Sequence, residues 1–381
     1  MALSTETTKY VKRLNGVANN LKHQFARRDT AIDLMRLALL CREHVLLLGP
    51  PGTGKSELVS RFGQGIHANS FQYLLTRFTE PAELFGPVDL KEFEQGRYQI
   101  STAGMLPCAQ IAFLDEVFQA SSAILNTLLS LIHERVFNNG STRQAVPLIT
   151  LFGASNHLPD DPTLRAFSDR FLLRIEVEPV ADESLGELLG RGWDMEVARL
   201  NDQAVDVEHL ITPEQLDHLY HQIPQVGMGD LQGQYQEIIR RLRAEGVTLS
   251  DRRLVKGLKL IRGAALLDGR DEADARDLWP LNHLWDSTDD RATLRDVVQP
   301  IVEEAGGPAL LIHRSLFELR EEFDLLESRV STLKGDGAFT AHLSALGQIR
   351  RELMLYHAKE KGLLEQVQDV IRVVLDGMRD V

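Results

Sequence analysis

The segment Gly49–Ser56 constrains the fold more than any other part of the chain. It reads GPPGTGKS and matches the phosphate-binding pattern G-x-x-x-x-G-K-[ST]. The apolar run HVLLLG before it predicts a short buried strand, and a helical pattern follows it. Glycines let the backbone approach a phosphate closely, and a helix that starts after the loop directs free N–H groups at the anion. Strand, loop and helix in this order predict an α/β nucleotide-binding core.

Every position of this loop has an expected contact with a nucleoside triphosphate. We expect Lys55 to reach the β- and γ-phosphates and Ser56 to bind Mg²⁺ through its hydroxyl. The other residues expected to line the nucleotide are Gly49, Pro50, Pro51, Gly52, Thr53, Gly54 and Glu57.

Two further apolar runs end in polar side chains. IAFLDE predicts a buried strand that ends in two carboxylates, and unpaired carboxylates are costly to bury. We expect Asp115 to hold Mg²⁺, directly or through water, and Glu116 to orient or deprotonate the attacking water. GASN ends a later run, and there Asn156 can hold the same water. Asn156 taken alone is more often a turn residue, so its expected role depends on the other two strands.

The periodicity of the chain divides it into three parts. In residues 1–180 strand-like runs alternate with helical patterns, which predicts a parallel sheet sandwiched by helices, preceded by an amphipathic N-terminal helix. Residues 181–290 read as helices separated by turns and predict an all-α domain. Residues 291–381 carry two heptad seams, interrupted at 334–337, which predict an antiparallel helical hairpin. The seam positions are Leu316, Leu319, Phe323, Leu326, Val330 and Leu333 before the interruption, and Leu346, Ile349, Leu353, Tyr356, Leu363, Val367, Val370, Val374 and Met378 after it. This hairpin either packs on its own chain or is presented to a partner or a neighbouring subunit.

Composition counts against several classes of protein, although a net charge does not exclude a local basic patch. The 42 Lys+Arg and 55 Asp+Glu residues give a formal net charge of −13, which repels nucleic-acid phosphates and anionic lipid. No stretch approaches the ~18 apolar residues of a transmembrane helix, and the N-terminus lacks a secretory signal. The two cysteines, Cys41 and Cys108, indicate no disulfide framework and are interpreted as apolar core residues of a reducing cytoplasm. We expect a soluble cytoplasmic protein that inserts into no membrane and binds no nucleic acid.

These motifs in this order resemble the AAA+ ATPases, and the segments between them resemble the MoxR family, especially its RavA subgroup. The resemblance covers roughly residues 20–290. It is carried by LLTRFTEPAELFGPVDL, FLDEVFQASSAILNTLLSLIHERVF and ASNHLPDDPTLRAFSDRFLLRI. It implies a P-loop AAA+ core with an all-α lid, hydrolysis of ATP with Mg²⁺, and a ring that is usually hexameric. It also implies chaperone-like remodelling of a partner, commonly together with a protein that carries a von Willebrand factor A domain.

The chain departs from the family in two places. Phe118-Gln119 stands where most MoxR proteins have Asn-Arg, which agrees with the RavA branch. The heptad hairpin after Gly307 stands where RavA continues into a β-rich domain, so the particular partners of RavA are not implied.

The resemblance assigns roles to three further positions. Asn156 matches the family's sensor 1. The triplet DRF makes Arg170 the arginine finger, which would reach the γ-phosphate of a neighbouring subunit, with Arg165 as the alternative. SDRR matches the sensor 2 region of the lid, where Arg252 is the first choice and Arg253 the alternative. A finger that acts on a neighbour implies a ring.

Two hairpins also belong to the resemblance. PVDL and RYQI, around an EFEQG turn, resemble the β-hairpin insertion in helix 2, and residues 134–152 resemble the hairpin before sensor 1. Both would line or cap a central pore, or remain solvated edge hairpins.

Three functions remain open at this point. The first is an ATPase that remodels or activates a protein partner, and the second is a nucleotide-gated scaffold with incidental turnover. The third is a nucleic-acid motor, against which the charge of −13 counts. Glu116, Asn156 and Arg170 together favour an active hydrolase. No N/T-K-x-D motif is present, so ATP is expected in place of GTP.

Overall fold

The computed structural model divides the chain into two compact units. The first unit is Met1–Val180 with Ser184–Leu310, and the second is Ala181–Glu183 with Leu311–Val381. The residues that the structure describes are 3–159, 161–201, 211–308, 316–330, 339, 342–343, 345–347, 349–350, 353 and 361–379.

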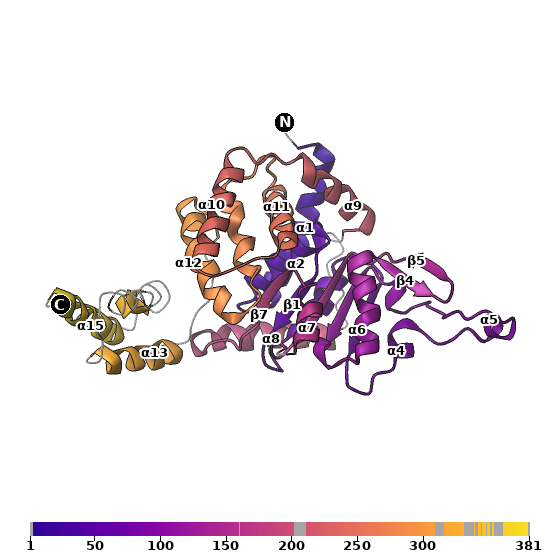
Figure 1. Cartoon of the computed structure of the whole chain (residues 1–381), viewed down its shortest axis with the longest axis horizontal. Coiled ribbons are helices and arrows are strands. Elements are labelled where there is room, and N and C mark those ends of the chain that lie inside the picture. The colour runs from indigo at the N-terminus through magenta and orange to yellow at the C-terminus, as the bar shows by residue number, and fades with distance from the viewer. Residues whose placement is uncertain are drawn as a thin grey trace. The chain divides into compact units, whose positions relative to one another are not determined.

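A five-stranded sheet lies at the centre of the first unit (Figure 1). Its order is β2-β3-β6-β1-β7, and every pair is parallel, as the sequence predicted. The strands are β1 Val45–Leu48, β2 Ser70–Leu74, β3 Ile111–Asp115, β6 Thr150–Ser155 and β7 Leu173–Glu176. The three central strands are short Val, Leu, Ile and Phe runs that are buried along nearly their whole length, as expected for a sheet covered on both faces. Because the strands are parallel, their carboxyl ends meet at one edge.

Helices cover this sheet. The helices of the core are α1 Thr5–Gln24, α2 Asp29–Cys41, α3 Lys55–Gln64, α6 Ser122–Leu129 and α7 Pro162–Ser168. α2 is apolar on nearly all sides because it packs against β7, against α1 and against the lid helix α11, Asp251–Leu267. This packing joins the core and the lid through one continuous apolar cluster.

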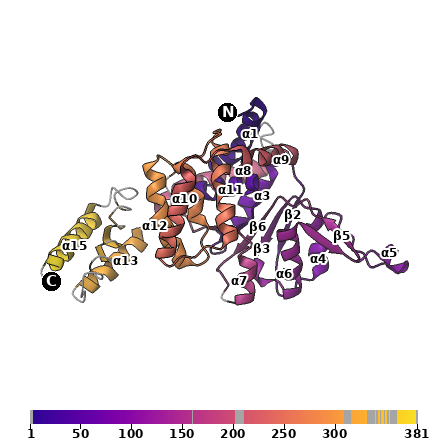
Figure 2. The ribbon, with the colours of Figure 1, turned by 45° about the horizontal axis from the view of Figure 1, so that its top comes forward.

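Two insertions extend from the core at the end of the unit away from the lid helices α10, Leu231–Ala244, and α12, Thr288–Glu304 (Figures 1 and 2). Their elements are α4 Pro81–Phe85, α5 Leu90–Glu94, β4 Val136–Asn139 and β5 Thr142–Ala145. β4 and β5 pair antiparallel, which confirms the predicted hairpin before β6. The two pieces of the predicted hairpin in helix 2 do pair, through an antiparallel bridge between Val88 and Ile100, but α5 lies between them where only a turn was predicted. The Asp89 carboxylate accepts from the N–H groups of Lys91 and Glu92, which starts a helix where a turn was expected.

Within residues 185–201 and 211–308, every regular element of the lid is a helix, as predicted. Its elements are α8 Leu185–Leu200, α9 Pro213–Gln222, η6 Ile223–Gln225, α10 Leu231–Ala244, α11 Asp251–Leu267, the 3₁₀ segment η7 Ala275–His283 and α12 Thr288–Glu304. The domain boundaries predicted at residues 180 and 290 stay predictions, and α12 continues across the second of them.

The second unit is helical, with α13 Leu316–Arg329 and α15 Lys361–Arg379. Its buried residues include nine members of the predicted seams, namely Leu319, Phe323, Leu346, Ile349, Leu353, Leu363, Val367, Val370 and Val374. The predicted break at 334–337 lies outside the described residues.

Two composition-based expectations can be compared with the structure. No described helix is both long enough and apolar enough to cross a membrane. Cys41 is buried as predicted, whereas Cys108 is exposed, so its predicted place in the core is wrong. Cys108 is the last residue of the short 3₁₀ turn Leu106–Cys108, and the buried residues of this turn are Leu106 and Pro107.

Candidate active site

The loop between β1 and α3 has the conformation of a phosphate cradle. Gly49, Gly52 and Gly54 all adopt positive φ, of 149°, 83° and 81°. A Cβ on Gly49 would lie 2.2 Å from the carbonyl oxygen of Val177, whereas a Cβ on Gly52 or Gly54 would meet nothing within 4 Å. The loop therefore borders open space where a ligand can approach. No side chain caps the N-terminus of α3, so its first N–H groups are free to bind an anion.

Lys55 lies at the start of α3 and is only 7% exposed. Its ammonium donates to the carbonyl oxygens of Gly49 and Pro50, both at 2.8 Å. Burial lowers the pKa of Lys55, while Asp115 and Glu116 oppose this change. Carbonyl oxygens leave the positive charge uncompensated, so a phosphate oxygen would be a stronger partner for this ammonium.

The polar ends of β3 and β6 meet beside the cradle. The Ser56 hydroxyl donates to Asp115 Oδ2 at 3.2 Å, and the Glu116 N–H donates to Asp115 Oδ1 at 2.9 Å. The Asn156 amide donates to Glu116 Oε1 at 3.1 Å. Four residues from three motifs are thus connected by hydrogen bonds at the carboxyl edge of the sheet, with the backbone N–H of Glu116 as the link to Asp115.

Glu116 has a strained backbone, with φ 50° and ψ 45°. A non-glycine residue in this left-handed region costs about 1 kcal/mol or more, and such residues gather at functional sites. Here the conformation turns the chain sharply after β3 and holds the Glu116 carboxylate next to Asn156.

The remaining loop residues contribute mainly backbone. Pro50 and Pro51 flank the turn, and the Thr53 hydroxyl donates back to Pro50 O at 3.0 Å. The Glu57 carboxylate points along α3 to Arg61, at 2.6 Å, so only its backbone N–H is oriented toward the cradle.

Arg28 also belongs to this site, although no sequence pattern indicated it. Its guanidinium donates to Thr53 O at 3.3 Å and to Glu178 O at 2.8 Å. Burial lowers the pKa of Arg28, with Glu178 opposing the change. Arg28 is therefore a second cation next to the cradle, and its hydrogen bonds connect the loop to the segment after β7.

The arginines assigned from the family pattern lie in a different group. Arg170, Arg252 and Lys256 line one pocket of about 40 Å³ together with Ile132 and His133 of the turn η3, Ser130–Glu134, which follows α6. The Nη1 of Arg170 contacts Asp169 at 3.4 Å, and its buried Nε has no hydrogen-bond partner. Arg165 is exposed on α7 and does not line this pocket.

Arg252 and Arg253, adjacent in sequence, have opposite environments. Arg253 is 1% exposed and donates to Leu284 O at 2.8 Å and to Asp169 Oδ1 at 3.1 Å. It also pairs with Asp286 at 2.8 Å. Arg252 is half-buried, and within the described part of the chain its guanidinium has no hydrogen bond or ion pair. Arg253 is thus bound within the protomer, and Arg252 is free to bind a ligand.

Comparison with known proteins places the chain in a family. Residues 12–221 match the MoxR domain of the MoxR-vWA-beta-propeller ternary systems, and residues 233–298 match an AAA lid domain. The chain belongs to the MoxR family. An uncharacterised protein of Methanocaldococcus jannaschii is 35% identical over 95% of this MoxR chain and 96% of its own length.

Two further relatives are more distant. The chaperone MoxR1 of Mycobacterium tuberculosis is 26% identical over 45% of this chain and 46% of its own length. The crystal structure of an ATPase candidate from Cytophaga hutchinsonii has a TM-score of 0.63 at 17% identity, over 78% of this chain and 96% of that one. At this identity the likeness supports the AAA+ fold alone.

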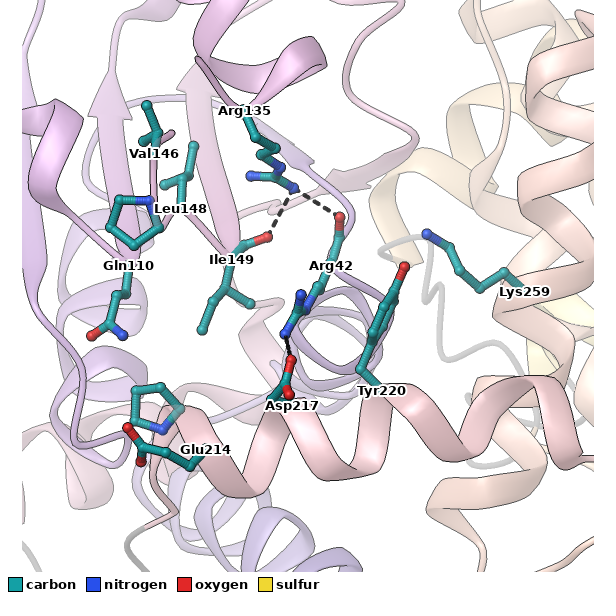
Figure 3. A pocket seen from close by; sticks show the side chains of 12 residues that line it. Arg42, Gln110, Arg135, Val146, Leu148, Ile149, Glu214, Asp217, Tyr220 and Lys259 are labelled. Carbon is teal, nitrogen blue, oxygen red and sulfur yellow. Dashed lines mark hydrogen bonds and ion pairs between the residues drawn. The ribbon is translucent and has the colours of Figure 1, made fainter. Parts of the chain in front are cut away.

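This MoxR chain has a second, larger cavity of about 620 Å³, at the edge of the sheet away from the cradle (Figure 3). Arg135 crosses its upper side and donates to the carbonyl oxygens of Arg42 and Ile149, both at 3.0 Å. Arg42 pairs with Asp217 of α9 and lies 4.4 Å from the centroid of the Tyr220 ring. These contacts connect α9 to the amino ends of β1 and β6, so the cavity is separate from the candidate active site.

Proposed function

We propose that this MoxR protein is a Mg²⁺-dependent ATPase that works as a ring, with each nucleotide cleaved between two protomers. The chain of hydrogen bonds from Ser56 through Asp115 and Glu116 to Asn156 carries this proposal, because it joins the groups that ATP hydrolysis requires at one edge.

The residues at the cradle fit both nucleotide and metal. Open space borders Gly52 and Gly54, and Lys55 offers a cation whose present partners are neutral carbonyls. Ser56 and Asp115 offer oxygen ligands, which Mg²⁺ prefers, and Mg²⁺ commonly binds through only one or two protein ligands. Bound there, Mg²⁺ would neutralise charge on the β- and γ-phosphates.

The roles of the other side chains follow from their contacts. Glu116 accepts the proton of the attacking water as general base, and its hydrogen bond from Asn156 keeps the carboxylate oriented. Lys55 and Arg28 stabilise negative charge on the phosphates by electrostatics, the usual main source of catalysis in phosphoryl transfer.

The neighbouring protomer supplies the cations that complete the site of ATP cleavage. Arg170 and Arg252 line a pocket whose residues include none of the cradle, so within one protomer they contact a different surface. Arg252 has no partner among the described residues. The Arg170 side chain is 27% exposed, and its only ion pair in the described part of the chain is a long one of 3.4 Å with Asp169, so both guanidinium groups can bind a phosphate presented by a neighbour. We take the ring to be hexameric, as the family resemblance implies.

The biological activity we propose is chaperone-like remodelling of a protein partner that carries a von Willebrand factor A domain. The family description, which names MoxR together with vWA and β-propeller components, supports this partner, and the chaperone name of the mycobacterial relative supports the activity. We place the protein in the cytoplasm.

The turnover test compares two arginines. Arg170→Ala should bind ATP with normal affinity and release phosphate at least about 10³-fold more slowly, the usual effect of losing an arginine finger. The exposed Arg165→Ala is the matched control and should turn over normally. Full phosphate release by Arg170→Ala, or its loss in Arg165→Ala only, would reject the assignment.

The partner test uses Glu116→Gln, which should bind ATP without cleaving it. Pull-down with this variant should enrich a vWA-domain protein relative to Lys55→Ala, which should bind no nucleotide. Equal recovery by both variants would show that nucleotide does not control the partner.

A further inference from the structure

His133 lies in the pocket of Arg170 and Arg252, and no sequence motif assigns it a role. It is exposed and belongs to η3, a π-helical turn, Ser130–Glu134, that ends α6. Single π turns are rare and often mark functional positions. The pocket is lined by His44, Ile132, His133, Asp169, Arg170, Leu172, Arg252, Arg253 and Lys256.

The charged groups around His133 leave an excess of positive charge. They come from its own turn, from the segment after α7 and from α11, and are Glu134, Asp169, Arg170, Arg252, Arg253 and Lys256. Asp169 is bound to Arg253, at 3.1 Å, and Lys256 is paired with the buried Glu43, at 2.6 Å. Arg252 has no carboxylate partner in the described residues, so the pocket is suited to an anion from outside the protomer.

Partial desolvation by the pocket walls, followed by the charges of Arg252 and Arg170, lowers the pKa of the exposed His133, while Glu134 opposes the change. In the isolated protomer the imidazole is therefore neutral near pH 7. An incoming polyphosphate would reverse the sign of the local charge and favour the protonated ring.

The backbone next to His133 is held rigidly by a second histidine. The His44 Nδ1 accepts from Leu151 N–H at 3.0 Å, so the proton is on Nε2, which donates to Ile132 O at 2.9 Å. Burial lowers the pKa of His44 well below its ordinary value, so this neutral form persists. The turn is thus bonded to β6, and His133 starts from a fixed position.

We propose that His133 donates a hydrogen bond to the triphosphate held by the neighbouring protomer, beside Arg170 and Arg252, and takes up a proton when that anion enters the pocket. This inference rests on the proposed function. Each interface would then offer three hydrogen-bond donors to the triphosphate. Arg170 and Arg252 are permanent cations, and His133 becomes charged when the anion binds.

The sign of the pH effect follows. If nucleotide raises the pKa of His133 in the assembled ring, its extra contribution to turnover is present below that raised pKa and is lost as pH rises through it. Asn at position 133 can donate a hydrogen bond but has no charge to gain.

The test measures phosphate release by the assembled protein between about pH 6 and pH 8.5, the range in which a histidine titrates. His133→Ala should be slower than wild type by about tenfold at the acidic end, the worth of one charge-assisted hydrogen bond. His133→Asn should retain most of the alkaline rate, and the ratio of wild type to His133→Asn should rise as pH falls. ATP affinity of each protomer should be unchanged, because His133 does not contact its own cradle.

Two results would overturn the inference. One is wild-type turnover by His133→Ala at every pH, and the other is a constant ratio of wild type to His133→Asn. A purely structural role would lower the melting temperature of both variants without changing that ratio. If Arg170→Ala loses turnover while His133→Ala keeps it, only this inference fails, whereas normal turnover in both rejects the proposed function as well.

Discussion

Arg252 and Arg253 provide a sharp test, because adjacent arginines should have opposite defects when replaced. Arg253 is buried, and its guanidinium joins α11 to the core through Asp169 and the carbonyl oxygens of Phe171 and Leu172. It also binds Asp286 and the carbonyl oxygen of Leu284 within the lid. Arg253→Ala should destabilise the protein and leave a wrongly seated lid. Arg252→Ala should keep the fold and slow ATP turnover.

The size of the Arg253 effect can be estimated from its contacts. Breaking a buried, hydrogen-bonded ion pair costs about 3–5 kcal/mol. Asp169 and Asp286 have side chains 32% and 41% exposed, so water can solvate them once Arg253 is gone. We therefore expect the lower end, about 3 kcal/mol, which corresponds to a fall in melting temperature of roughly 5–10 °C. Arg252→Ala should change the free energy of unfolding by less than about 0.5 kcal/mol.

Thermal unfolding of the nucleotide-free protein at one fixed concentration measures this difference, and phosphate release measures turnover. Arg252→Ala should lose at least about tenfold in rate, as expected when one stabilising cation is removed. Equal melting temperatures for the two variants, or a large fall for Arg252→Ala only, would refute the assignment of the two arginines.

Three further predictions concern stability and reactivity. Gly49→Ala should destabilise the core by more than about 2 kcal/mol in urea unfolding and should abolish ATP binding. The reason is that the new Cβ would lie 2.2 Å from the carbonyl oxygen of Val177, at a φ of 149° that alanine rarely adopts. Wild-type stability and ATP binding would disprove that geometry. Burial raises the pKa of the Cys41 thiol to about 12, so a thiol reagent should titrate only exposed Cys108 in the native protein and both cysteines after denaturation; two native thiols would contradict the buried position. Burial also lowers the pKa of His283 to about 4 and that of His44 well below its ordinary value, so the unfolded chain binds more protons in mildly acidic solution. The free energy of unfolding should accordingly fall as pH drops from about 6.5 toward 4, and the fall should be smaller in His283→Gln; identical slopes would refute this contribution.

Local patterns were sufficient to predict the fold and the elements that carry the cradle. Asp115 and Asn156 lie at the end or directly after the end of a predicted strand, and Lys55 and Ser56 begin the helix after the loop that follows another. Parallel pairing then brings these strand ends together. This inference needs only the alternation of apolar runs with helices, which is a property of the sequence itself.

Contacts that depend on tertiary packing were not predictable in this way. Arg28 reaches the cradle from the start of α2, with no motif around it. Neighbouring residues on a helix point about 100° apart, so only the packing of α11 against the core decides that Arg253 is buried and Arg252 is not. The π turn that carries His133 depends on a bond from His44, about ninety residues earlier in the chain. In the insertion, the local cap from Asp89 prevailed over the expected hairpin turn.

The central claim is that the neighbouring protomer completes the site that cleaves ATP, and a subunit-mixing assay tests it most directly. Lys55→Ala lacks a working cradle but keeps its arginines, and Arg170→Ala has the reverse defect, so each alone should be nearly inactive. Mixed in equal amounts and reassembled, they should recover about one quarter of the wild-type rate of phosphate release, because one interface in four pairs an intact cradle with an intact finger. A mixture no more active than its separate components, in rings shown to contain both variants, would contradict cleavage between protomers.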